Sequence, residues 1–292
     1  MATDPTTTTD PIAADGPTAG DEGYDTASSN AGSTYATTIS SYIREGIEEN
    51  GRQYAAYGKH AYGLPVDERE QERNDLQHVK FNMLLGDKLF TSPIEPTTIL
   101  DLGTGSGIWL STSPTDVEDE WLLKKDSFDL IHARELLLSI RDYPRLFKQA
   151  LDHLKPGGYL EVNSSLATPT SDDGSLPEDA ALLQLRDMFF AMGEKMGTPI
   201  DCVKQFKKQL EVAGFVDVVE NIIKMPQGPW PKDKRLKKIG AFENYSLSTG
   251  MEAYLMRGYT AVMGGDPDQL RVIMTQGLKE LADPSIHMYA YL

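Results

Sequence analysis

The chain has 292 residues, 40% of them hydrophobic, and a formal net charge of -16 at pH 7. This excess of negative charge argues against a nucleic-acid backbone or an anionic membrane surface as a partner. The single cysteine, Cys202, excludes an internal disulfide and a cysteine-rich zinc site, and the five scattered histidines have no metal-binding spacing. No apolar stretch reaches membrane-spanning length, so we expect a cytoplasmic protein and leave a nuclear location open.

Residues 1–40 consist almost wholly of Thr, Ser, Ala, Gly, Asp and Pro. Such a segment buries too little apolar surface to offset the entropy of ordering, so we predict a disordered tail followed by one α/β domain over residues 41–292. Residues 41–50 are expected to form a short amphipathic helix or an ordered tail. Tyr54 and Tyr57 follow in a tyrosine-rich segment.

Residues 68–89 are predicted to form a helix. Acidic residues lead this segment, and inward-facing positions recur with a period near 3.6 at Leu76, Val79, Lys80, Met83 and Leu84. We expect the helix to pack beside the strand that follows it.

A buried strand followed by three glycines is the most informative stretch. Residues 98–102 are rich in β-branched and aliphatic side chains, and Gly103, Gly105 and Gly107 come directly after them. Alternate glycines permit positive φ and let a ligand reach backbone N–H groups, and Asp101 is placed to accept a cationic or amide group. The spacing differs from the dinucleotide-binding and Walker patterns. The alternative is a glycine turn that only closes a core strand.

A βαβ unit is predicted next. Residues 128–132 form its first strand, residues 143–154 an amphipathic helix, and residues 159–162 its second strand. The segment 156–158, Pro-Gly-Gly, is predicted to turn the chain into that second strand.

The C-terminal part is predicted to be mainly helical. Helices are expected at 178–196, 202–213, 232–263 and 267–281, and strands at 215–224 and 288–292. Residues 232–285 would form a lid, in which Met251, Met256 and Met263 either fill a core or line a substrate site.

Three runs together resemble motifs I, IV and V of the class I S-adenosylmethionine-dependent methyltransferases, namely residues 99–109, 126–134 and 154–162. Flanking segments such as Asp75-Leu-Gln-His78 and Asp283-Pro-Ser-Ile-His287 narrow the resemblance to the fungal LaeA-like methyltransferases of secondary metabolism. The resemblance runs from about residue 42 to the end of the sequence. It implies a Rossmann-like α/β fold with a mostly parallel sheet and a helical lid.

One part of the family pattern is shortened. Only residues 108–126 separate the glycine loop from the strand at 128–132, where a class I methyltransferase has two further strands with their helices. Each parallel crossover needs about a dozen residues, so strands 2 and 3 are predicted to be missing. Residues 99–102 would then form a sheet edge open to a second copy or a pathway protein. An incorrectly spliced coding sequence is the other explanation.

The resemblance implies S-adenosyl-L-methionine as cofactor, with its methionine part on the glycine loop and its ammonium group near Asp101. Tyr54 and Tyr57 would either cap this cofactor or attach an N-terminal arm to the domain. The acidic residue that takes the ribose in relatives belongs to a missing strand. Asp116 would either match part of the adenine-side motif or belong to a solvated acidic loop.

His132 and Glu135 are the candidates for deprotonating an acceptor hydroxyl, because they follow the strand end where open α/β sheets bind ligands. His132 is equally suited to packing. Methyl transfer needs no protein nucleophile, since the chain mainly has to position donor and acceptor and exclude water.

Two functions stay open from the sequence. The first is a S-adenosylmethionine-dependent methyltransferase acting on a small-molecule intermediate of fungal secondary metabolism. The second is a catalytically degenerate relative that steers a biosynthetic pathway without methyl transfer. Cofactor binding would separate them, because the second predicts weak affinity or none.

Overall fold

The computed structural model describes residues 46–56, 62–109 and 116–292, which lie in one compact unit, Ser40–Leu292. The predictions made for the tail 1–40 and for Tyr57 fall outside the described residues.

Three parallel strands form the sheet at the centre of the fold. They are β3 (Ile99–Leu102), β4 (Phe128–Arg134) and β5 (Leu154–Asn163), hydrogen-bonded in that order. In the described part of the chain β3 has one neighbouring strand, β4, and no strand forms between them in sequence. The predicted Rossmann-like α/β fold is therefore confirmed, with the reduced sheet that the short segment implied.

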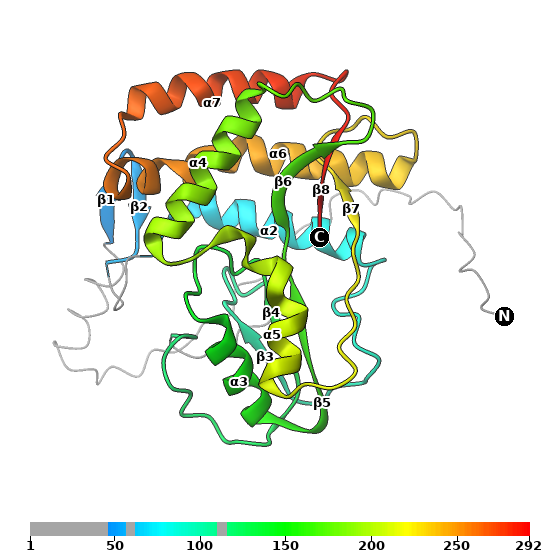
Figure 1. Ribbon diagram of the computed structural model, residues 1–292. Helices are drawn as coiled ribbons and strands as arrows, with labels where there is room; N and C mark the ends of the chain where they lie inside the picture. The colour runs from blue at the N-terminus through cyan, green and yellow to red at the C-terminus, as the bar shows by residue number, and fades with distance from the viewer. Residues whose placement is uncertain (1–45, 57–61, 110–115) are drawn as a thin grey trace, which may run out of the picture. The chain divides into compact units, whose positions relative to one another are not determined.

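Two helices cover one face of this sheet, α3 (Tyr143–His153) and α5 (Phe206–Ala213), as Figure 1 shows. The side chain of Asp142 caps α3 by accepting a hydrogen bond from the backbone N–H of Arg145. The predicted apolar stripe of α3 is buried, and Phe147 meets Phe206 of α5 edge to face. The 3₁₀ helix η1 (Ile200–Gln205) begins the predicted helix 202–213, which ends at a left-handed Gly214.

β5 begins earlier than predicted. It starts at Leu154, directly after α3, and includes the segment 156–158 that was predicted as a turn. The pairing of β5 with β4 shifts in register between Phe128 and Leu130, and Gly157 has a φ of 81°. The two glycines therefore form an irregularity within the strand rather than a turn before it.

A helical layer packs around a second core rich in leucine and methionine. Its main helices are α4 (Ala181–Met196), α6 (Lys234–Arg257) and α7 (Pro267–Ala282), with the π-helix η2 (Gly258–Val262) after α6. Met251 and Met256 are buried in this core. Within the described residues, no helix is both long enough and apolar enough to cross a membrane.

A small antiparallel sheet joins this layer. Its order is β6 (Leu166–Ser171), β8 (Met288–Tyr291) and β7 (Lys224–Pro226), so the predicted last strand is confirmed. In Figure 1, β6 continues from the end of β5 towards α4 and α6. It links the two layers.

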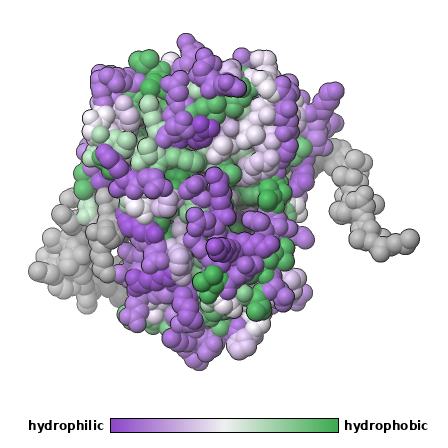
Figure 2. All heavy atoms as spheres, in the orientation of Figure 1, coloured by the Kyte–Doolittle hydropathy of each residue, from purple (hydrophilic) through white to green (hydrophobic). Residues whose placement is uncertain are grey.

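The predicted strand at 215–224 is wrong, because only Lys224 of that range lies in a strand. Val216 and Val219 are 83% and 78% exposed, and Asp217 has a φ of 52°, which interrupts an extended chain. Figure 2 shows hydrophobic residues scattered among hydrophilic ones on the face it presents. The alternation of valines in this segment therefore does not mark a paired strand.

A hairpin follows the undescribed residues 41–45, so the described part of the segment 41–50 fits the expected ordered tail and not the alternative, a helix. β1 (Ile47–Glu49) pairs antiparallel with β2 (Arg52–Tyr54). Asn50 and Gly51 connect them with φ values of 52° and 75°, as an Asn-Gly hairpin turn requires.

The helix α2 (Glu68–Leu84) forms as predicted but ends before residue 89, and the face it buries differs from the predicted one. Its buried residues are mostly charged or polar, namely Glu70, Arg73, His78, Lys80, Phe81 and Leu84. Val79, predicted to face inward, is 40% exposed. Lys80 Nζ instead donates to Glu243 Oε2 of α6 over 2.6 Å, which joins the two helices.

Removing one partner of the buried Lys80–Glu243 pair leaves an uncompensated charge. We therefore expect Lys80→Met to lower the free energy of unfolding by about 3–5 kcal/mol, and the double variant Lys80→Met, Glu243→Leu to lose clearly less. Urea unfolding measures both. As a control, Lys148→Met removes the exposed pair with Asp152 and should cost less than about 1 kcal/mol. An equal cost for the two lysine variants would contradict the prediction.

Candidate functional site

A cavity of about 940 Å³ lies between the glycine loop and the helical layer. Asp101, Gly103, Gly105 and Trp109 line one side of it. Apolar residues of the helical layer and the small sheet line the other, among them Leu185, Phe189, Leu247, Met251, Leu255 and Met288. The cavity therefore opens at the carboxyl ends of β3 and β4, the position where open α/β sheets bind ligands.

The glycine loop has the conformation that its spacing predicted. Gly103, Gly105 and Gly107 have φ values of 71°, 58° and 81°. A Cβ on Gly103 would lie 2.6 Å from Leu136 Cδ2, so this position requires glycine. At Gly105 the nearest atom to a Cβ would be Asn74 Nδ2 at 3.9 Å, so this glycine leaves open space beside the cavity. The backbone N–H of Gly107 donates to Thr104 and closes the turn.

Asp101 and His132 form a buried pair at the centre of the sheet. His132 Nδ1 donates to Asp101 Oδ1 over 2.9 Å, and the Trp109 ring stacks on the imidazole with centroids 4.1 Å apart. Asp101 lines the cavity, whereas His132 lies behind Trp109 and is not among the lining residues. The carboxylate expected to meet the cofactor's ammonium group therefore already has one protein partner. The base role of His132 stays a prediction.

Glu135 follows β4 with a φ of 53°, an uncommon value for a residue that is not glycine. Its Oε1 accepts hydrogen bonds from the backbone N–H and the hydroxyl of Ser165, at 2.8 and 2.7 Å. Burial raises the pKa of this carboxyl above its ordinary value, and the nearby Lys80 opposes the shift. Glu135 lines the cavity, so it is the better placed of the two predicted bases.

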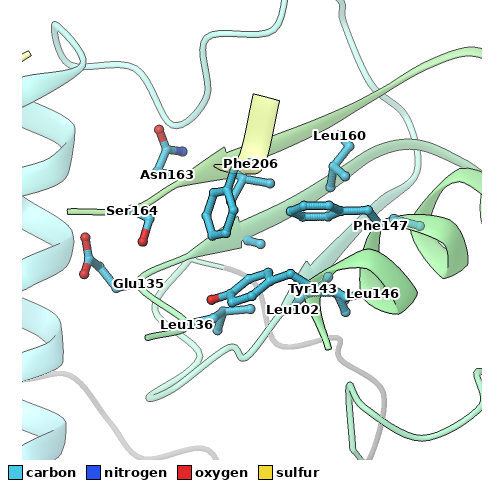
Figure 3. Close-up of a pocket in the computed structure, with 13 residues that line it drawn as sticks. Leu102, Glu135, Leu136, Tyr143, Leu146, Phe147, Leu160, Asn163, Ser164 and Phe206 are labelled. Carbon is cyan, nitrogen blue, oxygen red and sulfur yellow. The ribbon is translucent and has the colours of Figure 1, made fainter. Parts of the chain in front are cut away.

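Figure 3 shows a much smaller cavity, of about 10 Å³, on the other side of the same strand end. Tyr143, Phe147 and Phe206 pack around it, and the Glu135 side chain points away from these rings towards α2. A space of this size holds one water at most, so it belongs to the core of the sheet and α3 rather than to a ligand site.

The remaining predicted site residues lie at the edges of the site. Tyr54 is fully buried in β2, and the guanidinium of Arg257 lies 4.4 Å from its ring centroid. This packing fits the attachment of the N-terminal arm, and Tyr54 is not among the residues that line the cavity. Asp116 is exposed and lines the cavity, and its Oδ1 accepts from the backbone N–H of Glu118.

The sequence analysis missed the charged residues that α2 and α6 contribute to the cavity wall. Arg73 of α2 forms an ion pair with Glu70 and donates to the hydroxyl of Tyr254 over 2.6 Å. Lys80 was assigned to the helix face by its spacing, but its pairing with Glu243 was not foreseen. The only sequence signal is that Glu70, Arg73 and Lys80 recur at helical spacing, which indicates a common face but not that the face is buried.

A parallel sheet with a glycine loop at the mouth of a large cavity defines a class of α/β proteins that bind nucleotide or nucleoside cofactors. Residues 73–220 match the family model described as a methyltransferase domain. The chain therefore belongs to the methyltransferase-domain family, and the resemblance found in its motifs is confirmed.

Its relatives are fungal proteins. It is 33% identical over 283 residues to the methyltransferase pytC of Aspergillus terreus, which covers 86% of this chain and 87% of that protein. It is 31% identical over 278 residues to the secondary metabolism regulator LAE1 of Cochliobolus heterostrophus, covering 82% and 91%. It is 29% identical over 251 residues to the probable methyltransferase tdiE of Emericella nidulans, covering 75% and 78%. Two of these three relatives are thus named as methyltransferases and one as a regulator of secondary metabolism.

The raised pKa of Glu135 predicts a pH effect on stability. Between the ordinary pKa of 4.5 and its raised value, the folded state holds a proton that the unfolded state has released. This stabilising contribution is lost as the pH rises through the folded-state pKa. We therefore expect Glu135→Gln, which keeps the acceptor oxygen but cannot ionise, to gain stability relative to the unmodified chain as the pH rises from about 4 to about 7.

Urea midpoints across this pH range test the prediction, with the exposed Glu220→Gln as a control for the loss of one negative charge. A stability difference that is constant with pH, or that shrinks as the pH rises, would show that Glu135 ionises in the folded state as it does in the unfolded chain.

Proposed function

We propose that this chain is a S-adenosylmethionine-dependent methyltransferase that transfers a methyl group to a small-molecule intermediate of fungal secondary metabolism, in the cytoplasm. The observation that supports this best is the junction of two unlike surfaces in one cavity. The glycine loop with Asp101 forms the polar side, and the helical layer forms an apolar side. A polar cofactor and a largely apolar acceptor would meet where the two sides join.

The polar side fits the cofactor on two counts. The open position beside Gly105 leaves room for a ligand to approach the backbone, and the carboxylate of Asp101 faces the cavity. The bound cofactor would supply an electrophilic methyl group. Gly103, Gly105 and Asp101 would hold its methionine part, as in the family that the motifs resemble.

The chain's own contribution to the reaction would be positioning and the exclusion of water. Leu247, Met251 and Leu255 of α6 present apolar surface to the acceptor. Glu135 is the group that would accept a proton from an acceptor hydroxyl, because it lines the cavity and burial raises its pKa. Its hydrogen bonds to Ser165 fix the direction of the carboxylate.

One observation favours the second function, an accessory or regulatory protein without methyl transfer. Asp101 is already bonded to His132, and Trp109 stacks over that pair at the mouth of the glycine loop. If this arrangement persists with ligand present, the cofactor's ammonium group shares the Asp101 carboxylate with His132. Affinity would then be low.

Titration calorimetry with S-adenosylmethionine and S-adenosylhomocysteine tests the proposal. We expect dissociation constants of about 1–100 μM, because the glycine loop and the cavity are already formed. Gly105→Arg should abolish this binding, because its side chain would fill the open space of the loop. Gly174→Arg, at another left-handed glycine with open space around it, is the matched control and should bind normally.

The absence of heat at about 1 mM ligand from a folded protein would rule out the enzyme and leave the accessory function. Thermal unfolding of each variant shows that it is folded.

We also propose that the outer edge of β3 mediates association with a second copy or a pathway protein, because β3 pairs with one strand only among the described residues. Leu100, Asp101 and Leu102 are buried, so the residues that cover them would have to move for a partner strand to pair there. Sedimentation velocity of the purified chain should then show a dimer, and Ile99→Lys should shift it towards monomer by placing a charge on the edge strand. Val219→Lys, at an exposed apolar residue outside the sheet, serves as the control. A monomer at every concentration would exclude self-association through this edge.

A further inference from the structure

One cation of the cavity wall differs from all the others described there. Arg134 is the last residue of β4, and its Nη2 donates to His78 Nδ1 of α2 over 3.1 Å. The guanidinium also lies over the Phe81 ring, 5.1 Å from its centroid. Its second terminal nitrogen, Nη1, is buried and has no hydrogen-bond partner among the described residues. Both contacts position the guanidinium, and neither neutralises its charge.

The other described cations that line the cavity all have a carboxylate partner. Arg73 pairs with Glu70, Lys80 with Glu243, Arg141 with Glu118 and Arg186 with Asp187, at N–O distances from 2.5 to 2.9 Å. Arg134 has no Asp or Glu within ion-pair distance in the described part of the chain. Among the described cations of this wall, Arg134 is therefore the one that can form an ion pair with a ligand.

Two carboxylates, those of Asp101 and Glu135, act on the charge of Arg134, and each already accepts a hydrogen bond from another residue. Asp101 accepts from His132, and Glu135 accepts from Ser165. Burial lowers the pKa of Arg134, and the charges of these two residues only partly oppose that shift. A guanidinium stays charged in proteins, and no carboxylate among the described residues forms an ion pair with Arg134, so its Nη1 can donate to a ligand.

A second orphaned atom lies close by in sequence. Gln77 Oε1, one residue before His78 on α2, is buried without a hydrogen-bond partner among the described residues, and Gln77 lines the same cavity. It is an acceptor, whereas Arg134 Nη1 is a donor. A donor group of a ligand in this cavity would satisfy Gln77 Oε1.

We infer that Arg134 is the carboxylate-binding residue of this cavity and donates from Nη1 to a ligand carboxylate. Guanidinium and carboxylate match in geometry and charge, and such bonds are among the strongest that side chains form. The inference rests on the proposed function, since it assumes that ligands enter this cavity. The carboxylate belongs either to the methionine part of the cofactor or to an apolar acid that serves as methyl acceptor.

Titration calorimetry with two matched ligand pairs tests this inference and separates the two sources. S-adenosylhomocysteine and 5′-methylthioadenosine differ in the amino acid part that carries the carboxylate. 2-Naphthoate and 2-naphthamide have the same shape and differ in charge. In at least one pair, we expect the unmodified chain to bind the ligand that has the carboxylate about tenfold or more tightly than the ligand that lacks it. R134Q should bind the two ligands of that pair with similar affinity.

R186Q is the matched control, because it removes an arginine from the same cavity wall whose charge Asp187 already compensates. It should keep the preference of the unmodified chain. Thermal unfolding shows whether R134Q is folded. If it is not, R134K replaces it; lysine keeps the charge but lacks the forked donors, and a loss of roughly threefold or more is expected.

If R134Q loses the preference only in the adenosine pair, Arg134 binds the carboxylate of the cofactor. If R134Q loses it only in the naphthalene pair, Arg134 binds the carboxylate of an acidic methyl acceptor. The inference is overturned if the unmodified chain prefers neither carboxylate, or if R134Q keeps the preference. The proposed function fails separately, when neither adenosine ligand binds at all. In that case the naphthalene pair still tests Arg134.

Discussion

The register between β3 and β4 is the constraint on which the site depends. Parallel pairing sets Asp101 opposite His132 and Leu102 opposite Ala133, so the two strands end at the same level. The glycine loop after β3 therefore starts beside Arg134 and Glu135 after β4. A slip of one residue would exchange the two faces of β3 and turn Asp101 away from His132.

The same strand ends explain why the cavity wall is charged. A helix that crosses the carboxyl edge of a parallel sheet faces polar loops and a ligand site rather than a second apolar layer. α2 occupies this place and buries Glu70, Arg73 and Lys80, each with an opposite charge. Paired charges of this kind contribute little to stability compared with apolar packing. Lys80 also joins α2 to α6 through Glu243, and Arg73 does so by donating to the hydroxyl of Tyr254.

Much of the fold was predictable because its signals are local. The β3 strand with its glycines, the amphipathic α3 and the C-terminal helices all follow from period, caps and glycine position, and all are confirmed. The reduced sheet was predictable from the short segment after the glycine loop once it was compared with the family pattern, since a parallel crossover cannot be shortened below a minimum. The described residues contain no strand between β3 and β4 in sequence. The family was indicated by the resemblance of three motif runs, and the match over residues 73–220 confirms it.

The errors arose where a local pattern met a tertiary constraint. Valines alternate between 215 and 224, but no neighbouring strand is available and Asp217 turns the chain, so the segment stays irregular. The inward face of α2 was predicted mainly from its apolar residues, whereas Glu243, the partner that lets Lys80 be buried, lies more than 160 residues away in α6. The site residues likewise fall into those that a local pattern predicts and those that depend on tertiary structure. Gly103 and Asp101 were located by their place after a strand, while the stacking of Trp109 on His132 depends on a loop that no spacing rule describes.

The contrast between Asp101 and Arg134 shows how the site divides its charges. Both lie at strand ends on the cavity wall, but Asp101 bonds to His132, whereas Arg134 Nη1 has no hydrogen-bond partner among the described residues. The hydrogen bond from His132 lets the chain bury the Asp101 carboxylate. Arg134 is held in place by His78 and Phe81, neither of which offers a negative charge. A cavity built in this way favours an anionic group at the end of β4, and the apolar surface opposite favours a ligand whose remaining part is hydrophobic.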